Sequence, residues 1–233
     1  MKLAFQIAYK NLVGAGLRTW LTVGVLSFAF VIIILYNGLI DGWNQQAKLD
    51  SIEWEYGNGQ LLNEDYNPSD PFTIEDGHGV LANVKDKDLT PILIRQAFIY
   101  PQGRMVGVSL KGIDVNQKVV KLPTELIKNS SAQMPVIIGK RMAESAKLKL
   151  NDEVLLRWRD KNGSFDAANV TVAGIFDCNV SMVDNGQIWI SIDQLYEITG
   201  LDDHATLFIA GDDYKNNEES AWNFKSLDVL LKD

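Results

Sequence analysis

The sequence predicts an α+β fold in which one N-terminal transmembrane helix precedes a domain outside the membrane. Three observations lead to this prediction. Residues 19–40 contain no charged side chain. Residues 56–233 alternate short strand-like runs with short helix-like runs, as is typical of an α+β domain. The first 40 residues carry net positive charge, whereas the rest of the chain is strongly acidic.

The uncharged run is long enough to cross a bilayer. At ~1.5 Å per helical residue, residues 19–40 cover the ~30 Å hydrocarbon core. Arg18 and Asp41 bound the run. Trp20 and Trp43, together with Arg18, are predicted to anchor it at the two membrane interfaces. The apolar region of a cleaved signal peptide is usually only ~7–15 residues and ends at small residues. This run is longer and has no Ala-x-Ala site, so we expect an uncleaved anchor.

The segments beside and within this helix suggest further roles. Residues 1–17 read as an interfacial helix on the cytoplasmic membrane face, with polar residues at four-residue spacing. Gly14 to Gly16 would bend the chain into the spanning helix; the alternative is a simple N-terminal extension of that helix. Gly24 and Ser27 place small residues within the span and are candidates for packing against a neighbouring helix.

Charge predicts the orientation. Residues 1–40 hold three basic residues and no acid, so they carry +3, and the chain total of −8 leaves −11 for residues 41–233. Basic flanks stay in the cytoplasm. The N-terminus is therefore predicted to be cytoplasmic and the main domain periplasmic, at a bacterial inner membrane. The acidic balance argues against a nucleic-acid surface.

The predicted elements of the outer domain follow one another closely. The spanning helix continues to about residue 55, and a loop covers residues 63–79. The remaining prediction is a hairpin of 92–100 with 106–110, a strand at 135–139, a helix at 140–147, strands at 154–158 and 170–174, a strand at 187–190, a helix at 191–199 closed by Gly200, a strand at 205–210 and a helix at 218–233.

The sequence contains no recognisable catalytic, metal or cofactor site, so we expect no enzyme. His78 and His204 are far apart in sequence and each is expected to stand alone, with His78 a solvated turn residue. Cys178, the only cysteine, is expected to be a small buried hydrophobe. Paired acids in polar turns are read as solvated loop charge, with a weak calcium site as the alternative; these pairs are Glu64-Asp65, Asp202-Asp203 and Asp212-Asp213.

Several segments together carry a resemblance that none carries alone. They are Ala8–Leu12, Leu17–Thr22, Leu110–Asp114, Val136–Gly139 with Met142-Ala143, Leu150–Val154, Val172–Phe176, Asp184 and Ile188–Ile190. In this combination the chain resembles the MacB/LolC/LolE family of ABC-transporter permeases over nearly its whole length. The match at residues 135–190 is the most specific part.

The resemblance implies a permease with four spanning helices and a large periplasmic domain between the first two. It implies two partners, a cytoplasmic ABC ATPase subunit and a second permease copy or paralogue, and a possible third in a periplasmic lipoprotein or carrier. ATP-driven helix movement would be transmitted to the periplasm, a mechanism called mechanotransmission, for lipoprotein release or export of periplasmic cargo. The implied parts are an extended transmembrane helix at 18–55, Porter (βαβ-containing) at 56–129 and 186–233, the latter returning toward the membrane, and a β-rich Sabre insertion at 130–185.

The chain departs from the family pattern in three places. It has one spanning segment and stops at Asp233, where the second would begin, so a partial chain is expected. Asn151 replaces the glycine of a Leu-x-x-Gly-Asp turn, and asparagine tolerates the left-handed conformation that such a turn needs. The hairpin at 160–167 is shorter than the LolC-type hook and lacks its proline, which puts direct docking of a carrier in doubt.

Two other readings compete with the permease. One is a transmembrane signalling subunit like the division protein FtsX, which regulates periplasmic partners but has a smaller domain without the pattern at 135–190. The other is a single-span, membrane-anchored periplasmic binding domain.

Overall fold

The computed structural model describes the chain except for residues 1, 15, 83, 85–87, 216–220 and 232–233. The described residues form two units, Met1–Gln46 and Ala47–Asp233. The first unit contains α1 (Lys2–Gly14) and most of α2 (Gly16–Ser51). Among the described residues, the helix that starts at Gly16 is the one that is long and apolar enough to cross a membrane. This agrees with the predicted anchor.

Both ends of the long helix are marked by glycine. Gly16 has a φ of +70°, a value that does not occur within a continuous α-helix. The helical ladder is therefore interrupted before α2, as the bend reading requires, although Ala15 lies outside the described residues. At the other end α2 passes into one π-helical turn, η1 (Ile52–Tyr56), and Gly57 closes it with a φ of +55°.

The second unit is built on a sheet with short helices around it. Its strands are β1 (Gly59–Asn63), β2 (Gly79–Val80), β3 (Leu89–Ile99), β4 (Val106–Ile113), β5 (Pro135–Gly139), β6 (Glu153–Arg159), β7 (Phe165–Phe176), β8 (Gln187–Ser191), β9 (His204–Ala205), β10 (Leu207–Ala210) and β11 (Trp222–Ser226). Its helices are η2 (Pro71–Ile74), η4 (Pro101–Gly103), α3 (Glu125–Lys128), α4 (Lys140–Ala146), α5 (Ser181–Asp184), α6 (Ile192–Thr199) and α7 (Leu227–Leu230).

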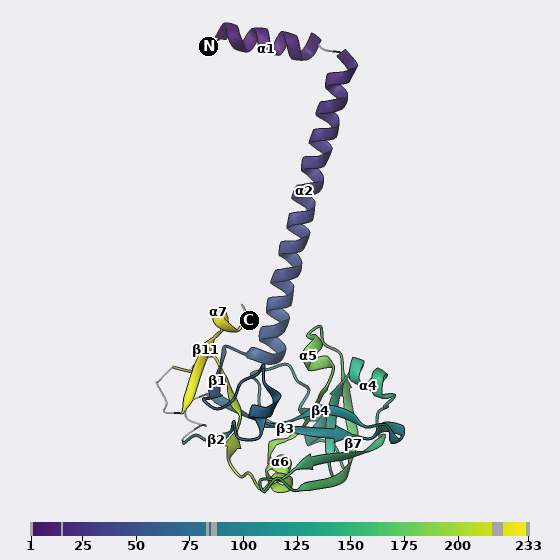
Figure 1. Ribbon diagram of the computed structural model, residues 1–233, viewed down its shortest axis with the longest axis vertical. Helices are drawn as coiled ribbons and strands as arrows, with labels where there is room; N and C mark the ends of the chain where they lie inside the picture. The colour runs from purple at the N-terminus through teal and green to yellow at the C-terminus, as the bar shows by residue number, and fades with distance from the viewer. Residues whose placement is uncertain (1, 15, 83, 85–87, 216–220, 232–233) are drawn as a thin grey trace. The chain divides into compact units, whose positions relative to one another are not determined.

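Six strands of the sheet close into a ring. The strand order is β11-β1-β10-β3-β4-β8-β5-β7-β6, and β6 also pairs with β3. The closing pairs include Ala97 with Trp158 and Ile99 with Leu156. The ring β3-β4-β8-β5-β7-β6 is therefore a small barrel, and β10, β1 and β11 extend from it as an edge sheet. Figure 1 shows β1 and β11 side by side on one flank of this unit and β7 on the other.

The barrel has a continuous apolar interior. Every ring strand contributes alternate side chains to one buried cluster, as expected from the two-residue period of a strand. Representative members are Leu93, Leu110, Val136, Leu156 and Ile188. Residues of α4 and α6 pack against the same cluster. Burial of this size is the main stabilising contribution in a domain without disulfides.

Two local features of the family-like segments have clear physical causes. A Cβ on Gly139 would lie 2.2 Å from the carbonyl oxygen of Asp184, so only glycine fits there. Asp184 is buried, accepts a hydrogen bond from the Arg141 N–H at the start of α4, and pairs with the Arg141 guanidinium. Asn151 has a φ of +67°. The prediction of a left-handed turn residue at Asn151 is confirmed.

The prediction of a helix over residues 218–233 is wrong. Residues 222–226 form strand β11, which pairs with β1 from Gly59↔Ser226 to Asn63↔Trp222, and only Leu227–Leu230 is helical. Residues 216–220 and 232–233 lie outside the described residues. The helical spacing of the leucines is real, but Trp222 packs on Phe208 of β10. Tertiary packing of the aromatic side chains therefore outweighs local propensity.

The predicted strand at 205–210 is divided in two. Thr206 separates β9 from β10, and its hydroxyl accepts a hydrogen bond from the Ile94 N–H at 3.0 Å. The other elements lie close to their predicted ranges. At α6, the helix begins after Ser191 and ends at Gly200 as predicted, but the Ser191 side chain forms no capping bond.

Candidate functional site

The membrane residues singled out from the sequence all lie on α2. Trp20 and Trp43 are exposed, as is Arg18. A Cβ on Gly24 would meet no atom within 4 Å, and Ser27 follows one turn later. This small-residue face is open within its own unit. Its packing against another helix and the anchoring role of Trp20 and Trp43 remain predictions.

The strongest candidate for a functional site is the base of the long helix. The last turns of α2 and the η1 turn belong to the second unit. Asp50 is 9% exposed and accepts a hydrogen bond from the Asn179 side chain at 3.1 Å. Asn179 precedes α5, so a residue 129 positions later in the chain holds the end of α2.

Two further contacts fix the same turns. Glu53 forms an ion pair with Lys121, and its carbonyl oxygen accepts a hydrogen bond from the Lys121 N–H at 2.8 Å. Trp54 stacks on Phe176 at the end of β7, with ring centroids 5.8 Å apart and planes 17° apart. A polar bond, an ion pair and a ring contact thus clamp one and a half turns of helix to the body of the domain. We call Asp50, Glu53, Trp54 and their partners the helix base.

The helix is predictable from the sequence, but the contacts that hold its end are not. The predicted continuation of the helix to about residue 55 is confirmed. Nothing in the sequence pairs Asp50 with Asn179, because the contact depends on where β7 and α5 bring the chain back. The usable signal is an aromatic residue in an otherwise polar helical stretch, which favours a buried contact.

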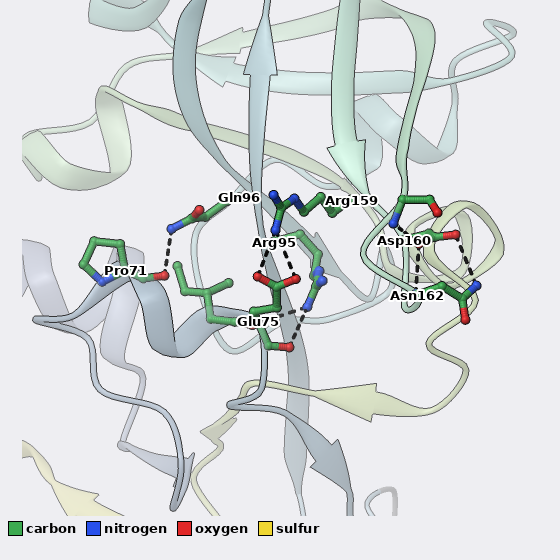
Figure 2. Close-up of polar contacts among 9 residues, drawn as sticks. Pro71, Glu75, Arg95, Gln96, Arg159, Asp160 and Asn162 are labelled. Atoms are coloured by element: carbon green, nitrogen blue, oxygen red, sulfur yellow. Dashed lines mark hydrogen bonds and ion pairs between the residues drawn. The ribbon is translucent and has the colours of Figure 1, made fainter.

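A second polar cluster fastens the 63–79 segment to the barrel. Arg95 is 4% exposed and its guanidinium donates to the carbonyl oxygens of Ile74 and Glu75 at 3.3 and 3.2 Å. Burial lowers the pKa of Arg95, and the nearby Glu75 carboxylate partly offsets this. Figure 2 shows Glu75 lying between Arg95 and Arg159, with the Arg159 ion pair at 3.2 Å. One loop is therefore joined to both β3 and the end of β6.

The hairpin at 160–167 is shorter than predicted and is tied down. Phe165 is the first residue of β7, opposite Arg159, so the turn covers only residues 160–164. The Asp160 carboxylate accepts bonds from the Asn162 and Ser164 N–H groups, and the first of these is drawn in Figure 2. The Lys161 N–H donates to the Thr199 carbonyl at 2.9 Å.

Phe165 is also engaged within the hairpin. Its ring lies 4.0 Å from the Arg157 guanidinium and 4.7 Å from that of Arg159. The Phe165 ring is therefore covered on the side of the two arginines. This geometry favours a structural role for the hairpin over a recruitment role.

The prediction that the two histidines stand alone is wrong. His78 and His204 lie with their Nδ1 atoms 2.9 Å apart, and their rings meet edge to face. The pairing of β2 with β9 brings them together, with Val80 opposite His204. Burial lowers the pKa of His78, and the nearby positive charges of Arg95 and His204 act in the same direction. Short strands with little pattern carry no signal of such a pairing.

The remaining chemical candidates behave as ordinary structural residues. Cys178 is buried, as expected, and burial raises the pKa of its thiol. Within the part of the chain that the structure describes, no three His, Cys, Asp or Glu residues gather as metal ligands. Asp212 accepts a hydrogen bond from the Asn58 side chain, and the Asp213 N–H donates to Asp88. These acidic turns are held by internal bonds.

No protein-family model matches the sequence, and a search of curated proteins finds no match. Solved structures do resemble it. One is the extracellular domain of the noncanonic ABC-type transporter YknZ from Gram-positive bacteria. It is 14% identical to this chain, with a TM-score of 0.36, and the alignment covers 66% of this chain and 83% of that one.

Proposed function

We propose that this chain is the N-terminal portion of a MacB/LolCE-type ABC-transporter permease subunit. Its role is to transmit ATP-driven motion from the membrane to the domain outside. The N-terminus is cytoplasmic and the domain is periplasmic, on the charge argument. ATP is hydrolysed by a separate ATPase chain, and this chain is not itself an enzyme.

The observation that carries the proposal is the helix base. A helix that serves only as a tether needs no fixed attachment, and a few flexible residues would be enough. Here α2 runs without a break from Gly16 to Ser51, and its last turns are clamped through Asp50 and Trp54. A stiff helix with a clamped end can pass on a displacement, whereas a flexible linker would absorb it.

The family-like segments support the proposal independently. Gly139 and Asp184 are separated by 45 positions yet meet in space, which explains why the resemblance needs both residues. The left-handed Asn151 occupies the turn where the family has glycine. These contacts concern local structure, and the assignment of Porter to 56–129 and 186–233 and of Sabre to 130–185 is part of the proposal.

The proposed partners follow from the same reading. A cytoplasmic ABC ATPase and a second permease copy or paralogue would bind in and below the membrane, with Gly24 and Ser27 on the packing face of α2. The cargo is a lipoprotein or another periplasmic molecule. Because the 160–164 turn is tied to Thr199, we assign it no role in capturing a carrier.

The test interrupts α2 just before the helix base while leaving the clamp and the domain intact. Gly-Gly-Ser is inserted between Gln46 and Ala47 of the permease, which is purified with its ATPase partner in nanodiscs. The matched control carries the same insertion after Gly103, in a turn with no neighbouring atoms within 4 Å of a Cβ. A spin label at Ser69→Cys, with Cys178→Ser, reports ATP-dependent movement of the domain.

We expect the complexes that contain either variant and the ATPase partner to hydrolyse ATP. The control should retain the ATP-dependent change in the label spectrum, and the insertion at residue 46 should lose most of it. Persistence of the full change in that variant would contradict mechanical transmission through α2. Failure of any ATPase chain to co-purify would contradict the permease assignment itself.

A further inference from the structure

A cavity of about 430 Å³ lies on the outer face of the barrel. Its floor is formed by β3, β4 and β8, and its walls by the 63–79 segment, α5 and the η1 turn. One wall is fixed by the Gln96 side chain, which donates to the Pro71 carbonyl at 2.7 Å, as Figure 2 shows. The volume falls within the ~300–1,000 Å³ range of small-ligand sites. All of its lining residues belong to the second unit.

The floor of the cavity is polar, whereas the adjacent part of the same face is apolar. Strand register places Gln96 opposite Ser109 on one side and Gln187 beside Ser109 on the other. Lys111 lies two residues further along β4, on the same face. Beyond it the same face continues into the buried apolar cluster that contains Ile113. Gln96, Ser109, Lys111 and Gln187 therefore gather beneath the cavity.

Two of these side chains are buried with incomplete partners. Lys111 is 9% exposed, and its ammonium lies 5.0 Å from the Trp189 ring. It forms no ion pair with any acid in the described ranges. Gln187 is 5% exposed, and its Oε1 has no hydrogen-bond partner. An unpaired buried polar group destabilises the folded protein, and more so when it is charged.

We propose that this Lys111 cavity binds a segment of peptide main chain, whose carbonyl oxygen accepts from the Lys111 ammonium and whose neighbouring N–H donates to Gln187 Oε1. The Lys111 ammonium has no anionic partner and Gln187 Oε1 has no donor, and an amide backbone supplies both an acceptor and a donor. Burial lowers the pKa of Lys111, and Glu55, which also lines the cavity, acts electrostatically in the opposite direction and favours the charged form. A neutral ligand therefore matches the site better than an anion.

The walls suit the side chains of such a peptide. Ile74, Ile94 and Met182 line the cavity beside the polar floor, so an apolar side chain can be buried while the main chain is hydrogen-bonded. This is the usual composition of a small-ligand site, with apolar walls and a few polar groups that set orientation. The inference goes beyond the transport proposal, because the cavity is complete whether or not an ATPase drives the protein.

The experiment measures peptide binding and stability on the same samples. The full chain in detergent micelles is titrated calorimetrically with capped tripeptides, acetyl-Ala-X-Ala-amide with X leucine, phenylalanine, lysine or aspartate. The variants are Lys111→Met and Gln187→Leu. Their matched controls are Lys149→Met, at an exposed site, and Gln194→Leu, which also removes a buried unpaired Oε1 but lies outside the cavity.

We expect the leucine or phenylalanine peptide to bind at millimolar or tighter affinity. Lys111→Met and Gln187→Leu should each weaken binding at least tenfold, and the two controls should not. Both cavity variants should unfold at the same or a higher temperature than the parent, because an apolar side chain removes an unpaired buried group. That combination of lost binding and retained stability separates a binding residue from a structural one.

Three results would overturn the proposal. One is the absence of binding by all four peptides. Another is tighter binding of the same peptides with a free C-terminal carboxylate, which would make the cavity an anion site. The third is a lower unfolding temperature for both Lys111→Met and Gln187→Leu, which would make these residues structural. None of these results bears on ATP-driven movement, so the transport proposal stands or falls separately.

Discussion

The barrel and the edge sheet are parts of one sheet but are stabilised differently. In the barrel each strand pairs on both sides, and one apolar cluster fills the ring. In the edge sheet, β11 pairs with β1 alone among the described strands. Its smaller cluster depends on a few aromatic contacts, such as that between Phe208 and Trp222, whose centroids are 4.8 Å apart.

This difference indicates that the barrel, and not the edge sheet, unfolds as one cooperative unit. A closed ring cannot lose one strand without exposing the interior of all six, so we expect it to open only on global unfolding. An edge strand can separate at a local cost. The helix base contacts the barrel side through Phe176, at the end of β7, and the chain then continues into β1 of the edge sheet.

The largest expected effect comes from overpacking the barrel. Gly139→Ala would place a Cβ 2.2 Å from the Asp184 carbonyl oxygen, a backbone atom that cannot move away cheaply. We expect a loss of more than ~3 kcal/mol in unfolding free energy, at or beyond the upper end of overpacking effects. Denaturant unfolding of the full chain measures it.

The control for this variant is Gly107→Ala. There a Cβ would meet the Phe98 ring at 3.8 Å, an ordinary contact, and we expect a change within ~1 kcal/mol. Equal effects of the two substitutions would mean that the close approach at Gly139 relaxes easily. The barrel would then be less tightly constrained than the comparison requires.

A smaller and local effect is expected at the edge sheet. Trp222→Ala removes the ring that packs on Phe208, and we expect ~2–3 kcal/mol, less than for a fully enclosed tryptophan. Hydrogen exchange should show lost protection in β11 and β1 while β5 and β7 stay protected. Loss of protection in β5 and β7 to the same extent would show that the two regions unfold as one.

The same division explains what the sequence could predict. The barrel strands at 92–100, 135–139 and 170–174 have dense β-branched or alternating patterns bounded by turns, and each was placed to within a few residues. The edge sheet was harder to predict. Residues 222–226 have the length of a single short strand, and their state depends on β1, which is 159 or more positions earlier in the chain.

The candidate sites divide in the same way. The spanning helix and its continuation to residue 55 follow from composition and length. The clamp from Asp50 to Asn179 and the pairing of His78 with His204 depend on topology, and neither has a local motif. The polar floor of the Lys111 cavity was predictable only in part. A lysine within a buried strand is visible in the sequence, but its neighbour Gln187 becomes apparent only with the parallel pairing of β4 and β8.

The histidine pair lies at the separate two-stranded sheet of β2 and β9 and offers a pH-dependent test outside the barrel. Because burial and nearby charge lower the pKa of His78 from its ordinary 6.5, the unfolded chain takes up a proton there before the folded chain does. The contribution of neutral His78 to the free energy of unfolding is therefore fully present above about pH 6.5. It is lost as the pH falls from that value toward the folded-state pKa of His78. Below the folded-state pKa both states are protonated and the loss stops growing.

We expect the unfolding temperature of the parent chain to fall between about pH 7.5 and 5.5. His78→Asn should show a shallower fall, because it removes the group that titrates. Hydrogen exchange should place the acid-induced loss of protection in β2 and β9. Identical pH slopes for parent and variant would mean that the His78 contact does not contribute to stability in this range.

The smallest effect is expected at the turn of the barrel hairpin. Arg159 and Phe165 are paired across it, so replacing residues 160–164 with Asn-Gly joins the same two strand ends through a two-residue turn. The change removes the Lys161 bond to Thr199, which is worth ~1 kcal/mol, while the Phe165 ring keeps both arginines. We expect an unfolding free energy within ~1 kcal/mol of the parent, and unchanged cargo transport by the assembled complex. A folded variant that fails to transport would instead make the turn a recruitment site. Failure to fold would show that ring closure at β3 and β6 depends on the tip of the hairpin.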